Sequence, residues 1–120
     1  MNPEFATAQK NLAECNVTIW DGMMQIVGLE DELTVQKAAL EVEAARIRLD
    51  PEVSLGKNEK ERDAQFTILA SQDEKYRAAL ESVRSLTVTL GEQKAKVVFQ
   101  EAQAREWRLV MGFLTAPRES

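Results

Sequence analysis

The chain has 120 residues, which is enough for one small domain. Apolar residues make up 44 % of it and charged residues 29 %, the net charge is −5, and there are only five Gly and three Pro. This balance excludes collagen-like, linker and disordered chains. No apolar run reaches the roughly 18 residues that a membrane-spanning helix needs, and no basic segment precedes an apolar one at the N-terminus. We therefore expect no membrane contact and a cytoplasmic location.

The inventory of reactive side chains is short. The chain has no histidine and a single cysteine, Cys15, so it has no internal disulfide, no Ser-His-Asp or Cys-His pair and no Cys/His zinc site. Glycine-rich phosphate-binding loops are also missing from it. We expect a protein that is not an enzyme and that binds neither a cofactor nor a metal. Cys15 itself is expected to be a small buried hydrophobe.

A first long helix is predicted over residues 5–49. Apolar residues recur in it at intervals of seven, which is typical of helices that pack side by side with a left-handed twist. The members are Leu12, Ile19, Ile26, Leu33, Leu40 and Ile47. We assign Trp20 and Met23 to the same packed stripe, as anchors of a core or of an interface. Gly22 and Gly28 are candidate bends.

Residues 50–58 are predicted to form a connector. Asp50 followed by Pro51 is typical of a helix N-cap and its first helical residue, so the first helix should end near Leu49. Gly56 suits a left-handed stop, and Asn58, with an acid three residues later, suits the cap of the next helix.

A second long helix is predicted over residues 59–114, closed by Pro117, with Gly91 as a further candidate bend. Its apolar positions again recur at intervals of seven, with partners three or four residues away. They include Leu69, Tyr76, Val83, Leu90, Val97, Trp107 and Met111. Together the two helices predict an all-α fold, a long antiparallel helical hairpin forming a single domain over 1–120.

Two helices alone cannot enclose a core. Residues 17–29 and 107–114 are apolar around most of the helix circumference, and such helices are normally buried on more than one side. We expect a homo-oligomer, a four-helix bundle dimer or a coiled-coil-like assembly, in which both apolar stripes line the interface. The alternative is a compact monomer in which the helices bend and cover one another.

Charge is distributed unevenly. No Lys or Arg occurs between Asn11 and Gln36, and this stretch contains a cluster of three acids, Glu30, Asp31 and Glu32, which form a candidate partner face. An acidic segment repels a phosphate backbone, so nucleic-acid binding by the first helix is disfavoured. Basic residues of the second helix alternate with acids, as on a solvated, salt-bridged face.

Three parts of the chain form one pattern: the segment Leu55-Gly56-Lys57-Asn58-Glu59-Lys60-Glu61-Arg62-Asp63-Ala64-Gln65, then Asp73, Tyr76 and Leu80, and then the Trp107-Arg108-Leu109 end. This pattern resembles one found in small helical proteins encoded by bacteriophages. The resemblance covers residues 50–114. It implies an accessory protein of a bacterial or phage-infected cell, associated with replication or recombination. Within the segment, Arg62 is placed to reach back to Asp50 or Glu52.

Three functions remain open from sequence. The first is a helical interaction or assembly protein that acts through protein–protein contacts. The second is a small acidic inhibitor or accessory factor of nucleic-acid-processing machinery, in which the acidic first helix engages a basic site. The third is direct nucleic-acid binding through the second helix.

Overall fold

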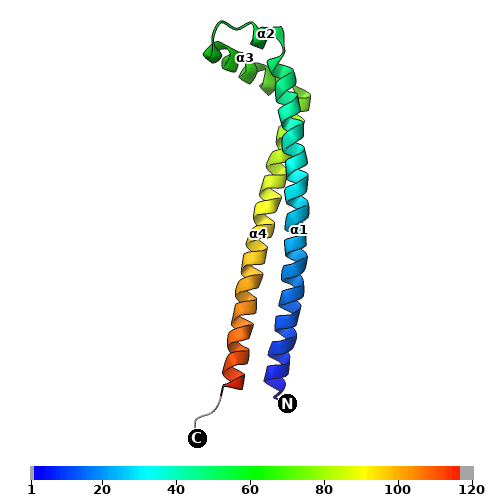
Figure 1. Ribbon diagram of the computed structural model, residues 1–120, viewed down its shortest axis with the longest axis vertical. Coiled ribbons are helices and arrows are strands. Elements are labelled where there is room, and N and C mark those ends of the chain that lie inside the picture. Colours follow the sequence, from blue (N-terminus) through cyan, green and yellow to red (C-terminus); the bar gives the residue numbers. More distant parts are fainter. Residues whose placement is uncertain (1, 117–120) are drawn as a thin grey trace. The chain divides into compact units, whose positions relative to one another are not determined.

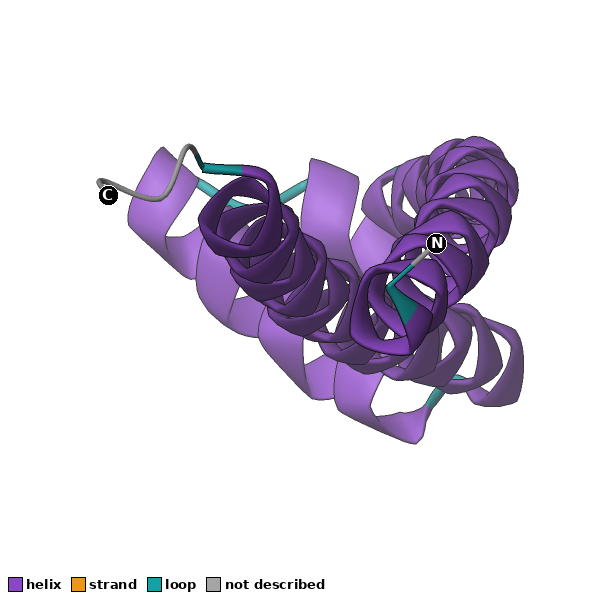
Figure 2. Ribbon diagram, turned by 90° about the horizontal axis from the view of Figure 1, so that it is seen from below, coloured by secondary structure: helices purple, strands orange, loops and turns teal. Residues whose placement is uncertain are grey.

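The computed structural model describes residues 2–116 and places nearly all of them in four helices: α1 (Pro3–Arg48), α2 (Pro51–Ser54), α3 (Glu59–Gln72) and α4 (Glu74–Thr115) (Figure 1). Within these residues the secondary structure consists of helices and loops only, with no strand (Figure 2). The predicted all-α class and helical hairpin are confirmed. Pro117, which was expected to close the last helix, lies outside the described residues.

Side-chain caps define three helix starts, and those at Asp50 and Asn58 are as predicted. Asn2 Oδ1 accepts the Glu4 N–H at 2.9 Å at the start of α1, and Asp50 Oδ1 accepts the Glu52 N–H at 2.9 Å at the start of α2. Asn58 Oδ1 accepts the Glu61 N–H at 2.8 Å at the start of α3. Each bond satisfies one of the N–H groups that a helix leaves free at its start, so the helix boundaries follow from short polar residues in the sequence.

The connector differs from prediction at Gly56. No glycine among the described residues has a positive φ, so Gly56 is not a left-handed stop. It is instead a point of close approach, because a Cβ there would lie 2.7 Å from Arg62 Cγ and 3.2 Å from the Val53 carbonyl oxygen. Arg62 Nη1 donates to the Gly56 carbonyl at 3.1 Å. The expected contact of Arg62 with acids of the connector is therefore wrong, since the nearer backbone carbonyl takes the guanidinium.

The predicted single helix over 59–114 is also wrong, because it is broken at Asp73. Asp73 has an extended backbone (φ −84°, ψ 118°) and lies between α3 and α4. Its Oδ1 accepts the Tyr76 N–H at 2.8 Å and so caps α4. The same carboxylate also accepts a hydrogen bond from the Arg46 side chain. The bond from Tyr76 satisfies one of the N–H groups that the start of α4 leaves free.

The chain divides into two compact units. Unit 1 combines α1 up to Gly28 with α4 from Leu90, and unit 2 contains residues 29–89. In unit 1 the buried core is thin, and its hydrophobic residues are two alanines and two larger side chains, namely Ala8, Leu90, Val97 and Ala104. In unit 2 Ile47 of α1, Val53 of α2 and Ala70 of α3 form a buried cluster, against which Phe66, Leu69 and Tyr76 pack.

Candidate functional site

The predicted heptad residues of α1 lie on one face, here called the inner stripe of α1. Leu33 and Ile47 are buried, and Leu12, Ile19, Ile26 and Leu40 are half-buried. Cys15, which was expected to be buried, is half-buried on this stripe. The seven-residue interval therefore identified the face of α1 that packs within the protein, and the role of these residues in an interface between copies stays a prediction.

The heptad residues of the C-terminal half behave in the same way. Leu90 and Val97 are buried. The other members are half-buried, namely Leu69 on α3 and Tyr76, Val83, Trp107 and Met111 on α4. The α4 members form the inner stripe of α4. In unit 1 the two inner stripes face each other.

Gly22 marks a close approach of α1 and α4 in unit 1. A Cβ on Gly22 would lie 2.7 Å from Val97 Cγ2, 3.3 Å from Gln93 Nε2 and 3.6 Å from Gln100 Oε1. Real Cβ atoms do not come this close to a neighbour, so only glycine fits. Gly22 is thus a packing position rather than the bend that the sequence suggested, since α1 runs through it without a break.

The pairing in unit 1 is antiparallel. Pro3 and Thr7, at the start of α1, line a groove of about 510 Å³ together with Trp107 and Phe113, near the end of α4. Gly22 of α1 lies opposite Val97 of α4. A residue of α1 is therefore at the same level along the hairpin as the residue of α4 whose number, added to its own, gives about 119. Figure 1 shows α1 and α4 lying side by side here.

Trp20 and Met23 do not belong to the packed stripe. Trp20 is 64 % exposed and Met23 is 44 % exposed, so neither is an anchor of a core within the hairpin, and their role at an interface between copies stays a prediction. The reason is geometric: at about 100° per residue, a side chain two positions from Gly22 lies about 200° around the helix from it. Because Gly22 faces α4, Trp20 faces away from α4.

A second set of apolar residues follows this outward face and is here called the outer stripe of α1. Its members are spaced by three or four residues and are more than half exposed: Val17, Trp20, Met24 and Val27. An exposed tryptophan in line with three exposed aliphatic side chains forms a contiguous apolar patch. Patches of this kind mark contact sites on soluble proteins.

An equivalent face lies on α4 and is here called the outer stripe of α4; the sequence indicated surplus apolar residues over 107–114 but not the face that they follow. It consists of Ala95, Val98, Ala102, Leu109 and Phe113, all exposed, the last 83 % exposed, and Phe99, 64 % exposed, lies beside it two positions after Val97. Ala95 and Ala102 each precede a buried residue, Val97 and Ala104, by two positions. The signal for this outer stripe in the sequence is the spacing of its members, which is three, four, seven and four residues. The seven-residue pattern of the inner stripe of α4 runs beside it and is stronger.

The acidic segment of α1 is open to solvent. Glu30, Asp31 and Glu32 are all exposed, as a partner face requires. Glu14 and Asp21, earlier in the same base-free stretch, are exposed as well, and Glu14 forms a long ion pair with Lys10 at 3.9 Å. Since both partners of that pair are exposed, it adds little to stability.

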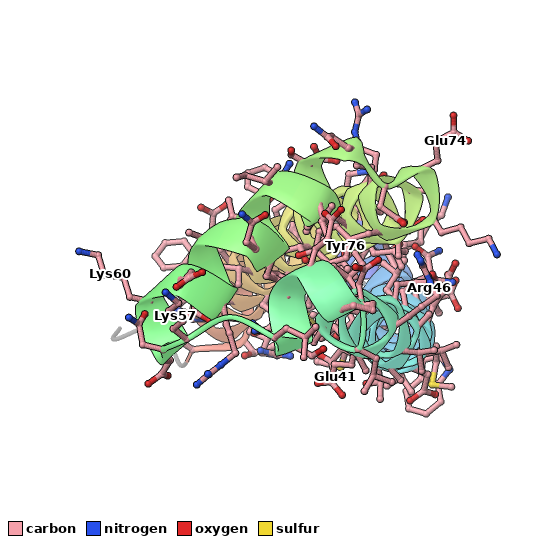
Figure 3. All side chains as sticks on the ribbon, turned by 90° about the horizontal axis from the view of Figure 1, so that it is seen from above. Glu41, Arg46, Lys57, Lys60, Glu74 and Tyr76 are labelled. Atoms are coloured by element: carbon pink, nitrogen blue, oxygen red, sulfur yellow. The ribbon has the colours of Figure 1, made fainter. Side chains whose placement is uncertain are left out.

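A polar cluster in unit 2 ties α1 to the break between α3 and α4. Arg46 Nη2 donates to Asp73 Oδ1 at 2.7 Å and lies 2.8 Å from Glu43 Oε2. The hydrogen bond from Arg46, followed by that from the Tyr76 N–H, lowers the pKa of Asp73 below its usual value. Arg46 and Tyr76 are both labelled in Figure 3, in which Lys60 and Glu74 extend away from the ribbon.

A cation–π contact extends this arrangement on α3. The guanidinium of Arg48 lies 4.1 Å from the centre of the Phe66 ring, and its Nη1 is 3.4 Å from Asp63 Oδ1. Phe66 in turn packs edge-to-face on Tyr76, with ring centres 5.9 Å apart. These contacts hold the buried cluster of unit 2 together and give it a structural role.

No group of three or more metal-ligating side chains occurs within residues 2–116, and none of the four helices is long and apolar enough to cross a membrane. Comparison of the chain with protein-family models, curated proteins and solved structures gave no match. The resemblance to phage-encoded helical proteins therefore stays a prediction. Among the described residues, the two outer stripes of unit 1 and the exposed acidic segment of α1 are features that a partner could use.

Proposed function

We propose that this protein is a non-enzymatic helical interaction protein that associates with further copies of itself through the outer stripes of unit 1. The observation that carries the proposal is the exposure of large apolar side chains on faces that the hairpin does not cover, with Trp20 at 64 % and Phe113 at 83 %. The inner stripes are already occupied by the α1–α4 contact. The outer stripes are therefore the surface offered to a partner.

The energetics support association. Burying apolar surface stabilises a contact by about 25 cal/mol per Å², and burying one large apolar side chain contributes about 1.5–3 kcal/mol. The outer stripe of α1 alone presents four such side chains. Tryptophan is enriched at the centres of protein interfaces, so Trp20 is the expected anchor of the contact.

The test is the molar mass in solution, measured by light scattering after size exclusion over a concentration series. Met24→Glu places a charge in the outer stripe of α1, and we expect it to weaken self-association at least about tenfold. The matched control is Gln25→Glu, which adds the same charge at the neighbouring exposed position, outside the stripe.

An unmodified chain that stays monomeric throughout the concentration series contradicts the proposal. So does a Gln25→Glu variant that dissociates as readily as Met24→Glu, because the effect would then come from net charge and not from the apolar face.

A second candidate function is binding to a basic protein partner through the acidic segment of α1, as an inhibitor or accessory factor of nucleic-acid machinery. Its support is the exposure of Glu30, Asp31 and Glu32 in a stretch without any base. Electrostatic association of this kind weakens steeply with salt. The measurement is the affinity for a candidate basic protein at low and at high salt. An affinity that is the same at both salt concentrations argues against this second function.

A further inference from the structure

The outer stripes of α1 and α4 occupy opposite sides of unit 1. Trp20 and Met24 lie two residues on either side of Gly22, and Ala95 lies two residues before Val97. At about 100° per residue, each of the three points away from the contact between the helices. A two-fold dimer formed through one stripe would leave the other stripe of each copy in water. Burial of both stripes requires every copy to make two contacts.

Charge distinguishes the ways in which the stripes can pair. From Asn11 to Gly28, α1 has two acids, Glu14 and Asp21, and no base. Pairing α1 with α1 of another copy would therefore set acids against acids. From Leu90 onward, α4 has four bases, Lys94, Lys96, Arg105 and Arg108, against three acids. Pairing α1 with α4 of another copy places the acidic segment beside these bases, and such complementarity selects between partners.

Side-chain size favours this pairing at two levels. In the register of the hairpin, Ala95 of α4 is level with Met24 and Ala102 is level with Val17, so a small side chain would meet a large one. Large side chains against small ones pack more closely than large against large. At the level of Trp20 the outward face of α4 carries Phe99, 64 % exposed, so that an aromatic pair would form there.

We infer that copies of this protein pack head to tail, with the outer stripe of α1 of one copy on the outer stripe of α4 of the next. The partner of each stripe is a second copy of this chain, and the contact is heterologous. Contacts of this type close into a ring or continue as a filament, in contrast to the two-fold dimer, which is one of the assemblies expected from sequence. The inference rests on the proposed self-association and specifies how it is built.

Two variants test the pairing, each blocking one stripe. The first carries Val17→Glu and Met24→Glu, and the second carries Ala95→Glu and Ala102→Glu. All four positions are exposed and spaced by seven, and glutamate is a good helix former, so the hairpin should persist. Far-UV circular dichroism and thermal melting check that it does.

A head-to-tail contact makes a specific prediction for these variants. Each variant alone is expected to be monomeric, with self-association weakened about 100-fold or more. An equimolar mixture restores one intact contact, because one variant keeps its α4 stripe and the other its α1 stripe. The mixture should contain a dimer with one copy of each variant, measured by light scattering and native mass spectrometry.

The possible failures are distinguishable. In the first failure, each variant still dimerises alone and the mixture gives no mixed dimer. Each stripe then pairs with the same stripe of another copy, so the head-to-tail inference is wrong while the proposed self-association stands. If the unmodified chain is monomeric at all concentrations, the proposed function itself fails.

Cysteine cross-linking gives a second measurement on folded protein, in a Cys15→Ala background. Val17→Cys mixed with Ala102→Cys should form the mixed disulfide in preference to either symmetric one. Preferential formation of the symmetric Val17→Cys disulfide overturns the inference.

Discussion

Arg46 and Asp73 are 27 residues apart in sequence, yet Arg46 Nη2 lies 2.7 Å from Asp73 Oδ1. The same carboxylate oxygen accepts the Tyr76 N–H and caps α4. One side chain thus performs two tasks: it ends α3 and starts α4, and it attaches this break to α1.

Asp73 gives the unfolding of the protein a defined pH dependence. Its pKa is lowered in the folded state, mainly by the Arg46 hydrogen bond, from an ordinary value of 3.8. A lowered pKa means that the stabilisation is present above pH 3.8 and is lost as the pH falls through the folded-state pKa. Asp73→Asn keeps a capping oxygen but loses the charge, so its Tm should lie below that of the unmodified protein at pH 7.

The Tm difference between the two proteins should shrink as the pH is lowered toward 3, measured by circular dichroism. Asp73→Ala, which also lacks the cap, should melt lower than Asp73→Asn at pH 7. A difference between Asp73→Asn and the unmodified protein that is the same at pH 7 and pH 3 contradicts the assignment.

The buried cluster of unit 2 depends on Val53, which is 2 % exposed and comes from the one-turn helix α2. Val53→Ala removes two buried methyl groups, and we expect it to lower the free energy of unfolding by about 1.5–3 kcal/mol in urea denaturation. Val42→Ala is the matched control, because Val42 is 66 % exposed and alanine favours the helix. Equal effects of the two substitutions would show that α2 is not part of the core.

Gly22→Ala should destabilise unit 1. The new Cβ would lie 2.7 Å from Val97 Cγ2, and overpacking of this kind costs about 1–3 kcal/mol. Gly28→Ala on the same helix is the control: a Cβ there meets nothing within 4 Å, so the change should stabilise by up to about 1 kcal/mol. In a double-mutant cycle read by thermal melting, Val97→Ala should recover part of the Gly22→Ala loss. Strict additivity would mean that the two residues do not touch.

Gln100 places a buried acceptor in the α1–α4 contact. Its Oε1 is shielded from solvent and has no hydrogen-bond partner within the described residues. Gln100→Leu removes the unsatisfied group at similar volume and should raise the free energy of unfolding by about 1–2 kcal/mol. The exposed Gln103 provides the comparison, and Gln103→Leu should change the stability by less than about 0.5 kcal/mol. A loss of stability in Gln100→Leu would show that the amide is satisfied in solution.

Sequence predicted those parts of the fold that depend on local rules. The caps at Asp50 and Asn58 and the face that carries Ile26 and Val97 follow from short-range chemistry and from the seven-residue interval. The break at Asp73 does not, because no Pro or Gly precedes it and its stabilising partner, Arg46, is 27 residues away. Breaks held by long-range contacts leave little local signal.

The candidate interface was less predictable than the fold. Residues 17–29 are apolar on all sides, so the sequence offers two stripes without saying which of them faces α4. The interpretation of Trp20 as an anchor of a core or of an interface follows from the enrichment of tryptophan at interface centres. The distinguishing residue is Gly22, whose missing side chain lets Val97 approach. An isolated glycine in a helix is ambiguous between a bend and a close contact, and here it is a contact.

The contact between Gly22 and Val97 also protects the hairpin against misalignment. A heptad pattern is nearly invariant to a slip of seven residues, so a long hairpin has several alignments that bury similar apolar surface. Slipping α1 by one heptad in either direction would bring Cys15 or Leu29 to Val97 in place of Gly22. Both residues carry a Cβ where the native alignment has no room for one. One missing side chain thereby gives the correctly aligned chain an advantage over its shifted competitors during folding.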